Sequence, residues 1–374
     1  MKRPFAFDPW LLILIIALTL IGAVAIQSGH TDALIKIQPK GALATYKPAI
    51  NHLMFALIGI VAMAVIARTP FNSWRKLASG FLIVTVALNL LPAFGLFVIE
   101  RNEAARWVQL PFLPFQFQPS EILKFATIVL FAVALEAFAH KRLATKHYLY
   151  SGIWLVGLAA VAIFQRDFGT AFVILLLAAT VAWVGGIRMT YFAAAVAVFV
   201  VLLGVYFHTG DEFRKDRIRA WLNPAYSVQG VNYQPNRAVD AIVSGGLFGK
   251  GVGSGQEKRN YSETSTDFVF ATIAEETGLF GGLVVLSLLG ALWWRLRHIA
   301  SKADREFARL AIYGAAAWIG YQTLLNVAMV TRLLPTVGIP LPFISMGGTN
   351  LVLIIALMGF AHRSANRTLP ENDR

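Results

Sequence analysis

The chain contains no cysteine, and its seven histidines are scattered along 374 residues. Without thiols it can form no disulfide, thiol nucleophile or thiolate metal site, and the histidines match no zinc-binding spacing. These absences exclude thiol-dependent catalysis and a zinc site encoded by a local motif. They also mean that an outward-facing loop has to be held by packing rather than by disulfides.

Charged residues are also scarce. They make up 14% of the chain, whereas hydrophobic residues make up 57%, and the mean hydropathy is +0.62. Soluble globular domains carry about 25% charged residues, so this composition indicates a polytopic membrane protein.

Ten apolar windows reach the length of about 17 residues that a bilayer core requires. We therefore expect an all-α integral membrane protein, a single domain over residues 1–374 with about ten transmembrane helices. Met1-Lys-Arg precedes the first window as in a signal peptide, but no small-residue cleavage pattern follows, so we expect this helix to be retained. The windows lie near residues 10–26, 51–67, 77–99, 121–139, 148–164, 168–186, 190–207, 268–294, 307–330 and 343–361.

Lysine and arginine are distributed unevenly between the two predicted sides of the membrane. An even number of spans places both termini on one side, which carries 17 of these residues. The other side carries 7 outside its one long loop, at about 208–267 between spans seven and eight. Because basic residues accumulate on the cytoplasmic side, we expect both termini to be cytoplasmic and the long loop to be extracytoplasmic.

The net charge of +13 largely reflects this cytoplasmic excess, so no nucleic acid partner is expected. The long loop nevertheless holds eight basic residues that the topology does not require. Such cations suit phosphate groups, and the sequence leaves open whether they meet a pyrophosphate or the headgroups of membrane lipid. They are Arg214, Lys215, Arg217, Arg219, Arg237, Lys250, Lys258 and Arg259.

Proline and glycine mark two irregular regions. Residues 100–119 hold three prolines among aromatics, which excludes a continuous helix and predicts an amphipathic re-entrant hairpin in the membrane interface. In the long loop we expect short helices between breaks at Pro224, Gly230, Pro235 and a glycine run over 245–255. Those glycines allow a close approach of another backbone.

Acidic residues occur where the long loop meets span eight. Asp267 directly precedes the apolar run, and Glu275 and Glu276 follow about two turns into it. Ionisable residues at membrane depth are costly and are functional candidates by default. At least one of the two glutamates should therefore face a polar interior or pair with a cation. The pattern is consistent with structural pairing and with a proton or ion relay.

Two further charged groups lie at the predicted outer ends of spans. Glu121 and Lys124 are three residues apart on one helical face at the start of span four, where Ser120 is a candidate N-cap. Asp167 immediately precedes span six. The first group is either an ion pair that anchors the helix or part of a substrate site, and Asp167 is either a helix cap or part of the same site.

A proline- and glycine-rich stretch precedes the last span. Residues 334–349 hold three prolines and three glycines, so the backbone there must be broken. Broken backbone at membrane depth is tolerated only where it is buried in protein or lines a cavity. A packing kink and a wall of the substrate site are both consistent with this stretch.

These segments, in this order, resemble the SEDS family (shape, elongation, division and sporulation), the RodA and FtsW proteins of bacteria. The resemblance spans nearly the whole chain. It rests on Ala105-Arg-Trp-Val108, Phe117-Gln-Pro-Ser-Glu-Ile-Leu-Lys124, Gln165-x-Asp167-Phe-Gly-Thr-Ala171, Arg217-Ile-x-Ala-Trp-Leu-Asn-Pro224, Tyr233-Gln234, Ala241-Ile-x-Ser-Gly-Gly246, Thr266-Asp-Phe-Val-Phe-Ala271, Glu275-Glu-x-Gly278 and Pro340-Leu-Pro-Phe-Ile-Ser345.

The resemblance implies a peptidoglycan glycosyltransferase that polymerises lipid II into a nascent glycan strand, on the outer face of the bacterial cytoplasmic membrane, in elongation or division. It also implies a class B penicillin-binding protein as the partner that crosslinks the product. Asp267 matches the family's essential loop aspartate and is the expected catalytic residue. A divalent cation (Mg or Mn) is compatible with this chemistry, although no spacing demonstrates one. The residues expected to bind substrate are Arg106, Glu121, Lys124, Asp167, Arg217, Gln234, Glu263, Glu276 and Ser345.

This chain departs from the family pattern at several positions. Ser265 stands where the family usually has a histidine, two residues before the catalytic aspartate, which removes any role for an imidazole. Arg332 stands where a small residue is commoner, and Arg166, Arg237 and Met346 are further departures. The acid and the overall frame are kept, so these departures bear on partner choice and substrate detail.

Two other functions fit the same composition. A transporter that flips lipid II would depend mainly on acids at mid-depth such as Glu275 and Glu276, whereas a polymerase requires Asp267 at the outer surface. A non-catalytic scaffold for a penicillin-binding protein would tolerate the loss of any single acid. Formation of polymer from lipid II by the purified protein separates these three functions.

Overall fold

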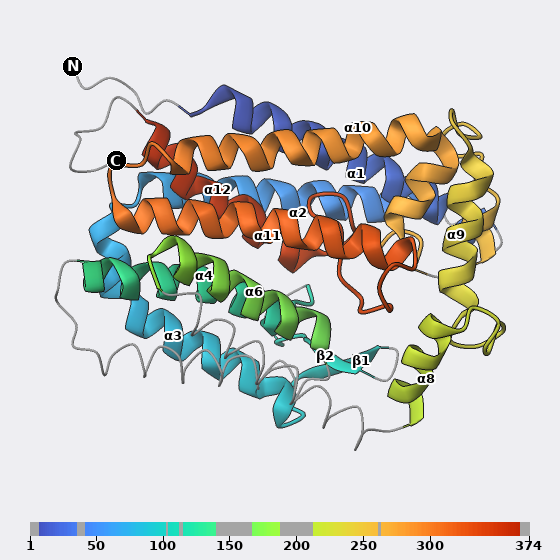
Figure 1. Cartoon of the computed structure of the whole chain (residues 1–374), viewed down its shortest axis with the longest axis horizontal. Helices are drawn as coiled ribbons and strands as arrows, with labels where there is room; N and C mark the ends of the chain where they lie inside the picture. Colours follow the sequence, from blue (N-terminus) through green and yellow to red (C-terminus); the bar gives the residue numbers. More distant parts are fainter. Residues whose placement is uncertain are drawn as a thin grey trace.

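The computed structural model describes residues 7–35, 42–101, 104–111, 115–139, 167–187, 212–260 and 263–366. Over these ranges the protein is mostly helical (Figure 1). The helices are α1 (Pro9–Ile35), α2 (Ala42–Arg68), α3 (Phe71–Ala93), α4 (Pro119–Ala139), α6 (Phe168–Val184), α8 (Glu212–Leu222), α9 (Tyr233–Gly245), the 3-10 turn η1 (Glu257–Asn260), α10 (Val269–Ala300), α11 (Glu306–Val330) and α12 (Gly348–Ala365). Two short strands, β1 (Val98–Arg101) and β2 (Ala104–Val108), pair antiparallel.

The long helices lie alongside one another, and α8 and α9 lie across one end of this bundle (Figure 1). α12 packs along α2, α10 contacts both α1 and α11, and α4 contacts α3, α6 and α11. Buried residues occur all around α11 and α12, as is usual for apolar helices in the middle of a bundle. These two helices therefore form the core against which the others pack.

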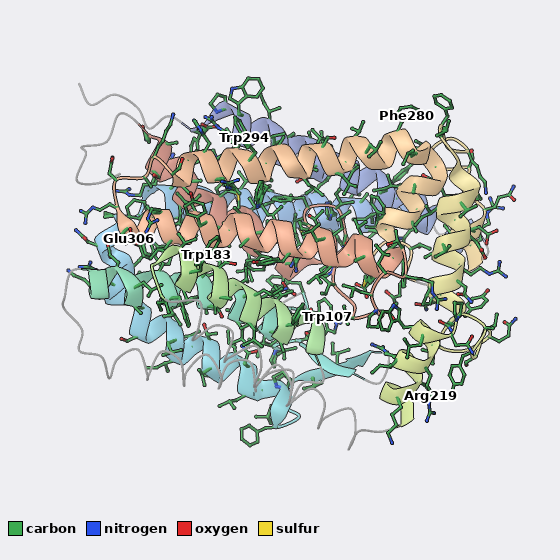
Figure 2. All side chains as sticks on the ribbon, in the orientation of Figure 1. Trp107, Trp183, Arg219, Phe280, Trp294 and Glu306 are labelled. Carbon is green, nitrogen blue, oxygen red and sulfur yellow. The ribbon has the colours of Figure 1, made fainter. Side chains whose placement is uncertain are left out.

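The start of α1 and the end of α12 meet at the end of the bundle opposite α8 and α9 (Figure 1). Asp8 forms an ion pair with Arg295 of α10, and its backbone N–H donates to Nδ1 of His362 at 2.9 Å. Figure 2 shows the same separation, with Glu306 at one end of the molecule and Arg219 at the other. The described chain thus begins and ends on one side of the bundle, as an even number of spans requires.

Eight of the ten predicted spans fall on helices of the bundle, namely α1, α2, α3, α4, α6, α10, α11 and α12. The other two predicted spans, 148–164 and 190–207, lie outside the described residues. Within the described residues four helices are long and apolar enough to cross a membrane: Pro9–His30, Tyr46–Arg68, Phe71–Pro92 and Val269–Ala300. They carry exposed large apolar side chains, among them Ile13, Leu57, Ile83 and Leu283, which suits contact with lipid. The protein is an all-α integral membrane protein, with a small β-hairpin added.

Two sequence-based span boundaries were wrong, the end of span three and the start of the last span. Span three ends at Ala93, where a turn with positive φ at Gly95 and Phe97 leads into β1. The segment expected to be a re-entrant hairpin contains β2 and, with β1, forms an antiparallel β-hairpin. Its valine, isoleucine and tryptophan residues favour extended backbone. The last helix begins only at Gly348 because the preceding proline- and glycine-rich stretch is irregular, as predicted.

α10 is bent at Gly278, whose φ of 67° and ψ of −167° are not helical. Its 32 residues would extend about 48 Å as one rod, more than the roughly 30 Å of a hydrocarbon core. Figure 1 shows the first part of α10 turned away from the long part, beside α9. Glu275 and Glu276 therefore lie in the short first part, a correction to the expectation that they sit two turns deep in one continuous span.

The glycine run after α9 packs directly against this bend. The backbone N–H groups of Lys250 and Gly251 donate to the carbonyls of Glu275 and Glu276 at 3.0 and 2.9 Å. A Cβ on Gly249 would lie 2.2 Å from the Glu276 carbonyl oxygen. The predicted close backbone approach is confirmed.

The long loop is built from short helices, as expected. Pro224 and Gly230 lie in the irregular connection between α8 and α9. Pro235 does not break a helix, because it lies in the first turn of α9, where its missing N–H group would have no helical partner.

Candidate active site

Asp267 lies in the turn just before α10, and its side chain is half-buried. Asn326 of α11 is fully buried, and its side-chain amide donates to the backbone oxygens of Asp267, at 2.8 Å, and Ile339, at 2.7 Å. One buried amide thus holds the aspartate turn and the proline-rich segment together. Hydrogen bonds in such a low-dielectric setting restrict both partners strongly.

Ser345 fixes the same turn from the other side. Its hydroxyl donates to the Thr266 backbone oxygen at 2.6 Å and accepts from Leu341 N–H at 2.7 Å. The N–H of Met346 donates to the Ser265 carbonyl at 2.8 Å. These bonds make Ser345 a positioning residue for the turn that carries Asp267.

Glu263 lies at the start of this turn. Its backbone oxygen accepts from Phe268 N–H at 3.1 Å, and its carboxylate accepts from the Thr266 hydroxyl. These contacts close the turn, and a direct contact of Glu263 with substrate remains a prediction.

The irregular segment 334–345 borders the Asp267 carboxylate. Gly338 has a φ of +68°, and a Cβ built on it would lie 3.2 Å from Asp267 Oδ2. Glycine therefore meets two needs at this position, because it adopts positive φ without strain and has no Cβ to crowd the carboxylate. This segment thus forms a wall beside Asp267.

Glu121 and Lys124 form a buried ion pair near the start of α4. Lys124 Nζ lies 2.6 Å from Glu121 Oε1, and the lysine side chain is 1% exposed. Glu121 Oε2 accepts from Asn350 of α12 at 2.6 Å, and the ammonium lies 5.2 Å from the centre of the Trp318 ring. The pair therefore joins α4 to α11 and α12, which fits the anchoring alternative, while its contact with substrate stays a prediction.

A polar row on α11 connects this ion pair with the aspartate turn. Gln322 Oε1 accepts from Asn350, the partner of Glu121, at 3.3 Å. Gln322 and Asn326 are four residues apart, so they lie on the same face of α11, and their Cα atoms are separated by about 6 Å along its axis. One face of α11 is thus linked to the ion pair through Asn350 and to the aspartate turn through Asn326.

Asp167 caps α6, the structural alternative considered for it. Its Oδ1 accepts from Thr170 N–H at 3.1 Å, and its Oδ2 accepts from Gln118 Nε2 at 2.8 Å and from the Ser120 hydroxyl at 3.1 Å. Ser120 is not the N-cap of α4 as expected, because that helix begins one residue earlier at Pro119, a residue preorganised for the first helical position. A role for Asp167 in binding substrate remains a prediction.

Two of the remaining predicted residues, Arg217 and Gln234, belong to the long loop, and Arg106 belongs to the β-hairpin. Arg217 of α8 reaches the wall segment, where its Nη1 lies 3.4 Å from the Thr336 carbonyl oxygen. Gln234 lies half-buried in the first turn of α9. Arg106 belongs to β2, and its side chain lies outside the described part of the chain.

Glu275 and Glu276 both find cations, as expected. Glu275 pairs with Lys250 at 3.0 Å, and Glu276 pairs with Lys258 at 2.6 Å. Lys258 also donates to the hydroxyl and the backbone oxygen of Ser28 in α1, at 2.8 and 3.0 Å. Structural pairing therefore accounts for both acids, and the assignment of Glu276 to substrate binding stays a prediction.

Three amides on α11 and α12 were missed by the sequence analysis, Gln322, Asn326 and Asn350. A signal was present, because Gln322 and Asn326 are spaced four apart in an apolar helix, and polar residues inside membrane helices usually face the protein interior. These amides carry no charge, so a search for ionisable residues in the membrane spans does not find them.

Within the part of the chain that the structure describes, no group of three or more His, Asp or Glu side chains could hold a metal ion. Among these described residues, Asp267 is therefore not part of a set of protein ligands that would hold a divalent cation. The predicted Mg or Mn ion stays a prediction, and no chemical step is assigned to it.

The fold and the site together define a polytopic membrane protein with a carboxylate held beside an irregular wall at one end of a helical bundle. The chain belongs to the FtsW/RodA/SpoVE family of cell cycle proteins, whose profile matches residues 9–368. This confirms the resemblance based on motifs.

Individual relatives agree with the family assignment. The chain is 32% identical over 370 residues to a probable peptidoglycan glycosyltransferase FtsW of Trichlorobacter lovleyi, covering 96% of this chain and 94% of that one. It is 31% identical over 376 residues to the protein of the same description from Coxiella burnetii, covering 97% of both chains. A solved chain from a peptidoglycan synthase complex that coordinates polymerization and crosslinking has a TM-score of 0.74 at 23% identity, covering 96% of this chain and 98% of that one, which shows the shared fold.

Proposed function

We propose that this protein is a peptidoglycan glycosyltransferase of the SEDS family, polymerising lipid II with Asp267 as its general base. The observation that carries the proposal is the placement of Asp267, whose flanking backbone is fixed by Asn326 and Ser345 while its carboxylate faces the wall at Gly338. A general base has to be held within hydrogen-bond reach of the proton it takes, and a carboxylate carried on a fixed main chain supports that role.

The reaction transfers a glycosyl group between two lipid-linked sugars. The 4-hydroxyl oxygen of the acceptor GlcNAc attacks the anomeric carbon of the donor MurNAc and forms the new glycosidic bond. The bond from that carbon to the pyrophosphate oxygen breaks, and undecaprenyl pyrophosphate leaves with the electron pair. The hydroxyl proton passes to the Asp267 carboxylate, the general base.

Negative charge grows on the departing pyrophosphate and has to be offset. Arg217 of α8 contacts the wall segment that also borders Asp267. Lys124 of α4 pairs with Glu121, whose partner Asn350 contacts the same face of α11 that carries Asn326. We assign these two cations and Arg106 to the pyrophosphate, because preorganised positive charge stabilises a charge that develops in the transition state. The cation of Lys124 would act after substrate displaces part of its present pairing with Glu121.

The proposed function sets the orientation of the molecule. Lipid II is polymerised outside the bacterial cytoplasmic membrane, so the end of the bundle with α8, α9 and Asp267 faces outward and both termini are cytoplasmic. A class B penicillin-binding protein is the proposed partner that crosslinks the nascent glycan strand. Division and elongation are both compatible with this site.

The direct test is polymer formation from lipid II in detergent by purified wild-type protein and by Asp267→Asn. We expect the variant to insert and unfold like the wild type but to make no polymer, because a carboxamide accepts no proton in the physiological pH range. The control is Asp240→Asn on α9, which removes an acid that is 55% exposed and should leave polymerisation unchanged. Near wild-type synthesis by Asp267→Asn would overturn the catalytic assignment.

The same assay separates the alternatives. A lipid II flippase would form no polymer in detergent, and a scaffold would form it only with an active glycosyltransferase partner added. Assays with and without a penicillin-binding protein whose own polymerase activity is absent are therefore decisive. Chelation with EDTA, followed by addition of Mg or Mn, tests the predicted cation in the same samples. Unchanged polymer synthesis in the presence of EDTA would contradict a requirement for the cation.

A further inference from the structure

Arg332 adopts a backbone conformation that usually belongs to glycine. It follows the last residue of α11 and the cap residue Thr331, and its φ is +62°. Helices commonly end with a glycine in this left-handed region, because side chains crowd the backbone there. An arginine at this position bears a conformational cost, so its side chain should contribute something that glycine cannot.

The guanidinium of Arg332 joins the end of α11 to both helices of the long loop. Nη1 donates to Asn236 Oδ1 in α9, and Nη2 donates to the Ala220 backbone oxygen in α8 at 2.6 Å. The contact is reciprocated, since Trp221 Nε1 donates to the Arg332 carbonyl at 3.1 Å. A planar guanidinium with several fixed donors is suited to such a bridge.

The bridge lies beside the proposed reaction centre. Arg217 and Trp221 are four residues apart on α8 and both contact the segment after α11, at Thr336 and Arg332. This segment continues to Gly338, which borders the Asp267 carboxylate. α8 is thus fixed on the same stretch of backbone that forms the wall of the site.

We propose that Arg332 is a positioning residue that holds the basic helix α8, and with it Arg217, in register with Asp267. Its effect on reaction rests on the proposed function, whereas its effect on the placement of α8 does not. Because α8 is assigned to the anionic part of the lipid-linked substrate, loosening it should weaken use of that substrate more than it slows turnover. The backbone itself should gain from losing the arginine side chain.

The first test compares Arg332→Gly with wild type in lipid II polymerisation. Glycine keeps the positive φ without strain, so the thermal unfolding temperature should be unchanged or higher. We expect KM for lipid II to rise about tenfold, the scale of losing roughly two hydrogen bonds, with a smaller change in kcat. Arg332→Lys should recover only part of this loss, because an ammonium cannot reproduce the two-sided contact of a guanidinium.

Arg237→Ala, which removes a surface arginine of the same loop, is the charge-matched control and should change KM less than about twofold.

The second test measures the placement of α8 relative to α11 and does not depend on polymerisation activity. Because the chain has no cysteine, spin labels can be placed on Leu222→Cys in α8 and Leu324→Cys in α11, both highly exposed. We expect a narrow distance distribution in the otherwise wild-type chain and a broader one with Arg332→Gly. A narrow distribution in both would overturn the proposed bridge.

The two tests fail separately. If the wild type makes no polymer, the proposed function fails while the spin-label distances still decide whether Arg332 holds α8. If the wild type is active and Arg332→Gly broadens the distances without changing KM, the link between this bridge and substrate use is overturned. A loss of thermal stability with KM unchanged would make Arg332 a stabilising residue only.

Discussion

Neutral amides and hydroxyls hold the proposed catalytic aspartate in place. Asn326 and Ser345 bond the backbone on either side of the Asp267 side chain, leaving its carboxylate beside Gly338. Because amides and hydroxyls carry no charge, they can be buried at low cost once hydrogen-bonded. The ionisable side chain of Asp267 is therefore positioned by neutral residues whose burial carries little energetic penalty.

The ion pair of Glu121 and Lys124 allows a test at the level of two residues. Removing one partner of a buried pair strands the other charge and costs about 3–5 kcal/mol of stability. We expect Glu121→Gln and Lys124→Met each to unfold at lower temperature, and the double variant to recover most of that stability. The measurement is thermal unfolding of all four proteins in one detergent.

The activity of the double variant then assigns the role of the pair. We expect it to remain low in lipid II polymerisation, because neutral side chains offer no charge to the pyrophosphate. A stable and active double variant would show that the pair only anchors the helix. The 2.6 Å contact between Lys124 Nζ and Glu121 Oε1 supports that role in the absence of substrate.

At the scale of elements, the bend in α10 depends on one glycine. Gly278 has φ and ψ values that are almost exclusive to glycine, and a Cβ there would lie 2.4 Å from the Leu247 carbonyl oxygen. We predict that Gly278→Ala destabilises the protein by at least about 3 kcal/mol, through strain and a steric clash together. Polymerisation should fall too, since the turn with Asp267 leads directly into this helix.

Gly290 provides the matched control on the same helix. Apart from the neighbouring backbone of its own helix, no heavy atom lies within 4 Å of a Cβ built there. The backbone is helical, so Gly290→Ala should be neutral or stabilising by up to about 1 kcal/mol. Equal unfolding temperatures for the two variants would show that the bend needs no glycine.

The opposite end of the bundle is held by Asp8, which joins α1 to α10 and α12. Burial disfavours its charged form, but hydrogen bonds from Arg295 and Leu11 N–H outweigh burial and hold the pKa of Asp8 below its ordinary value of 3.8. A carboxylate whose pKa is lowered by folding stabilises the folded state above its unfolded pKa, and this contribution is lost as the pH falls through the folded pKa.

Replacing this carboxylate should therefore matter in a pH-dependent way. We expect Asp8→Asn to lower the unfolding temperature at pH 7, by a stability change of about 1–3 kcal/mol. The difference from wild type should shrink once the pH falls below 3.8, the ordinary pKa of the group. A difference that stays constant down to low pH would mean that packing, and not the charge, accounts for the effect.

At the scale of the whole molecule, the sequence predicted what depends on composition and missed what depends on packing. Apolar windows located the helices, because the length of an apolar run can be seen in the sequence. The glycine run predicted the close contact at the bend of α10, because a residue without a side chain allows another backbone to approach. The end of α3 was misplaced because apolar residues continue into a strand. The spacing of Gln322 and Asn326 indicated a polar face on α11, but the contacts of Asn326 and of Arg332 could not be predicted, since each joins segments far apart in the chain.

The orientation of the molecule can be tested because the chain has no cysteine. Ser254 in the glycine-rich segment and Ser301 after α10 are both exposed, and the long part of α10 between them, Leu279 to Ala300, extends about 33 Å, enough to cross a bilayer. We expect a membrane-impermeant maleimide to label Ser254→Cys in right-side-out membrane vesicles and to label Ser301→Cys only after permeabilisation. The unsubstituted chain, which has no thiol, gives the background. The opposite pattern would place Asp267 in the cytoplasm, where a polymerase of lipid II on the outer face of the membrane could not use it.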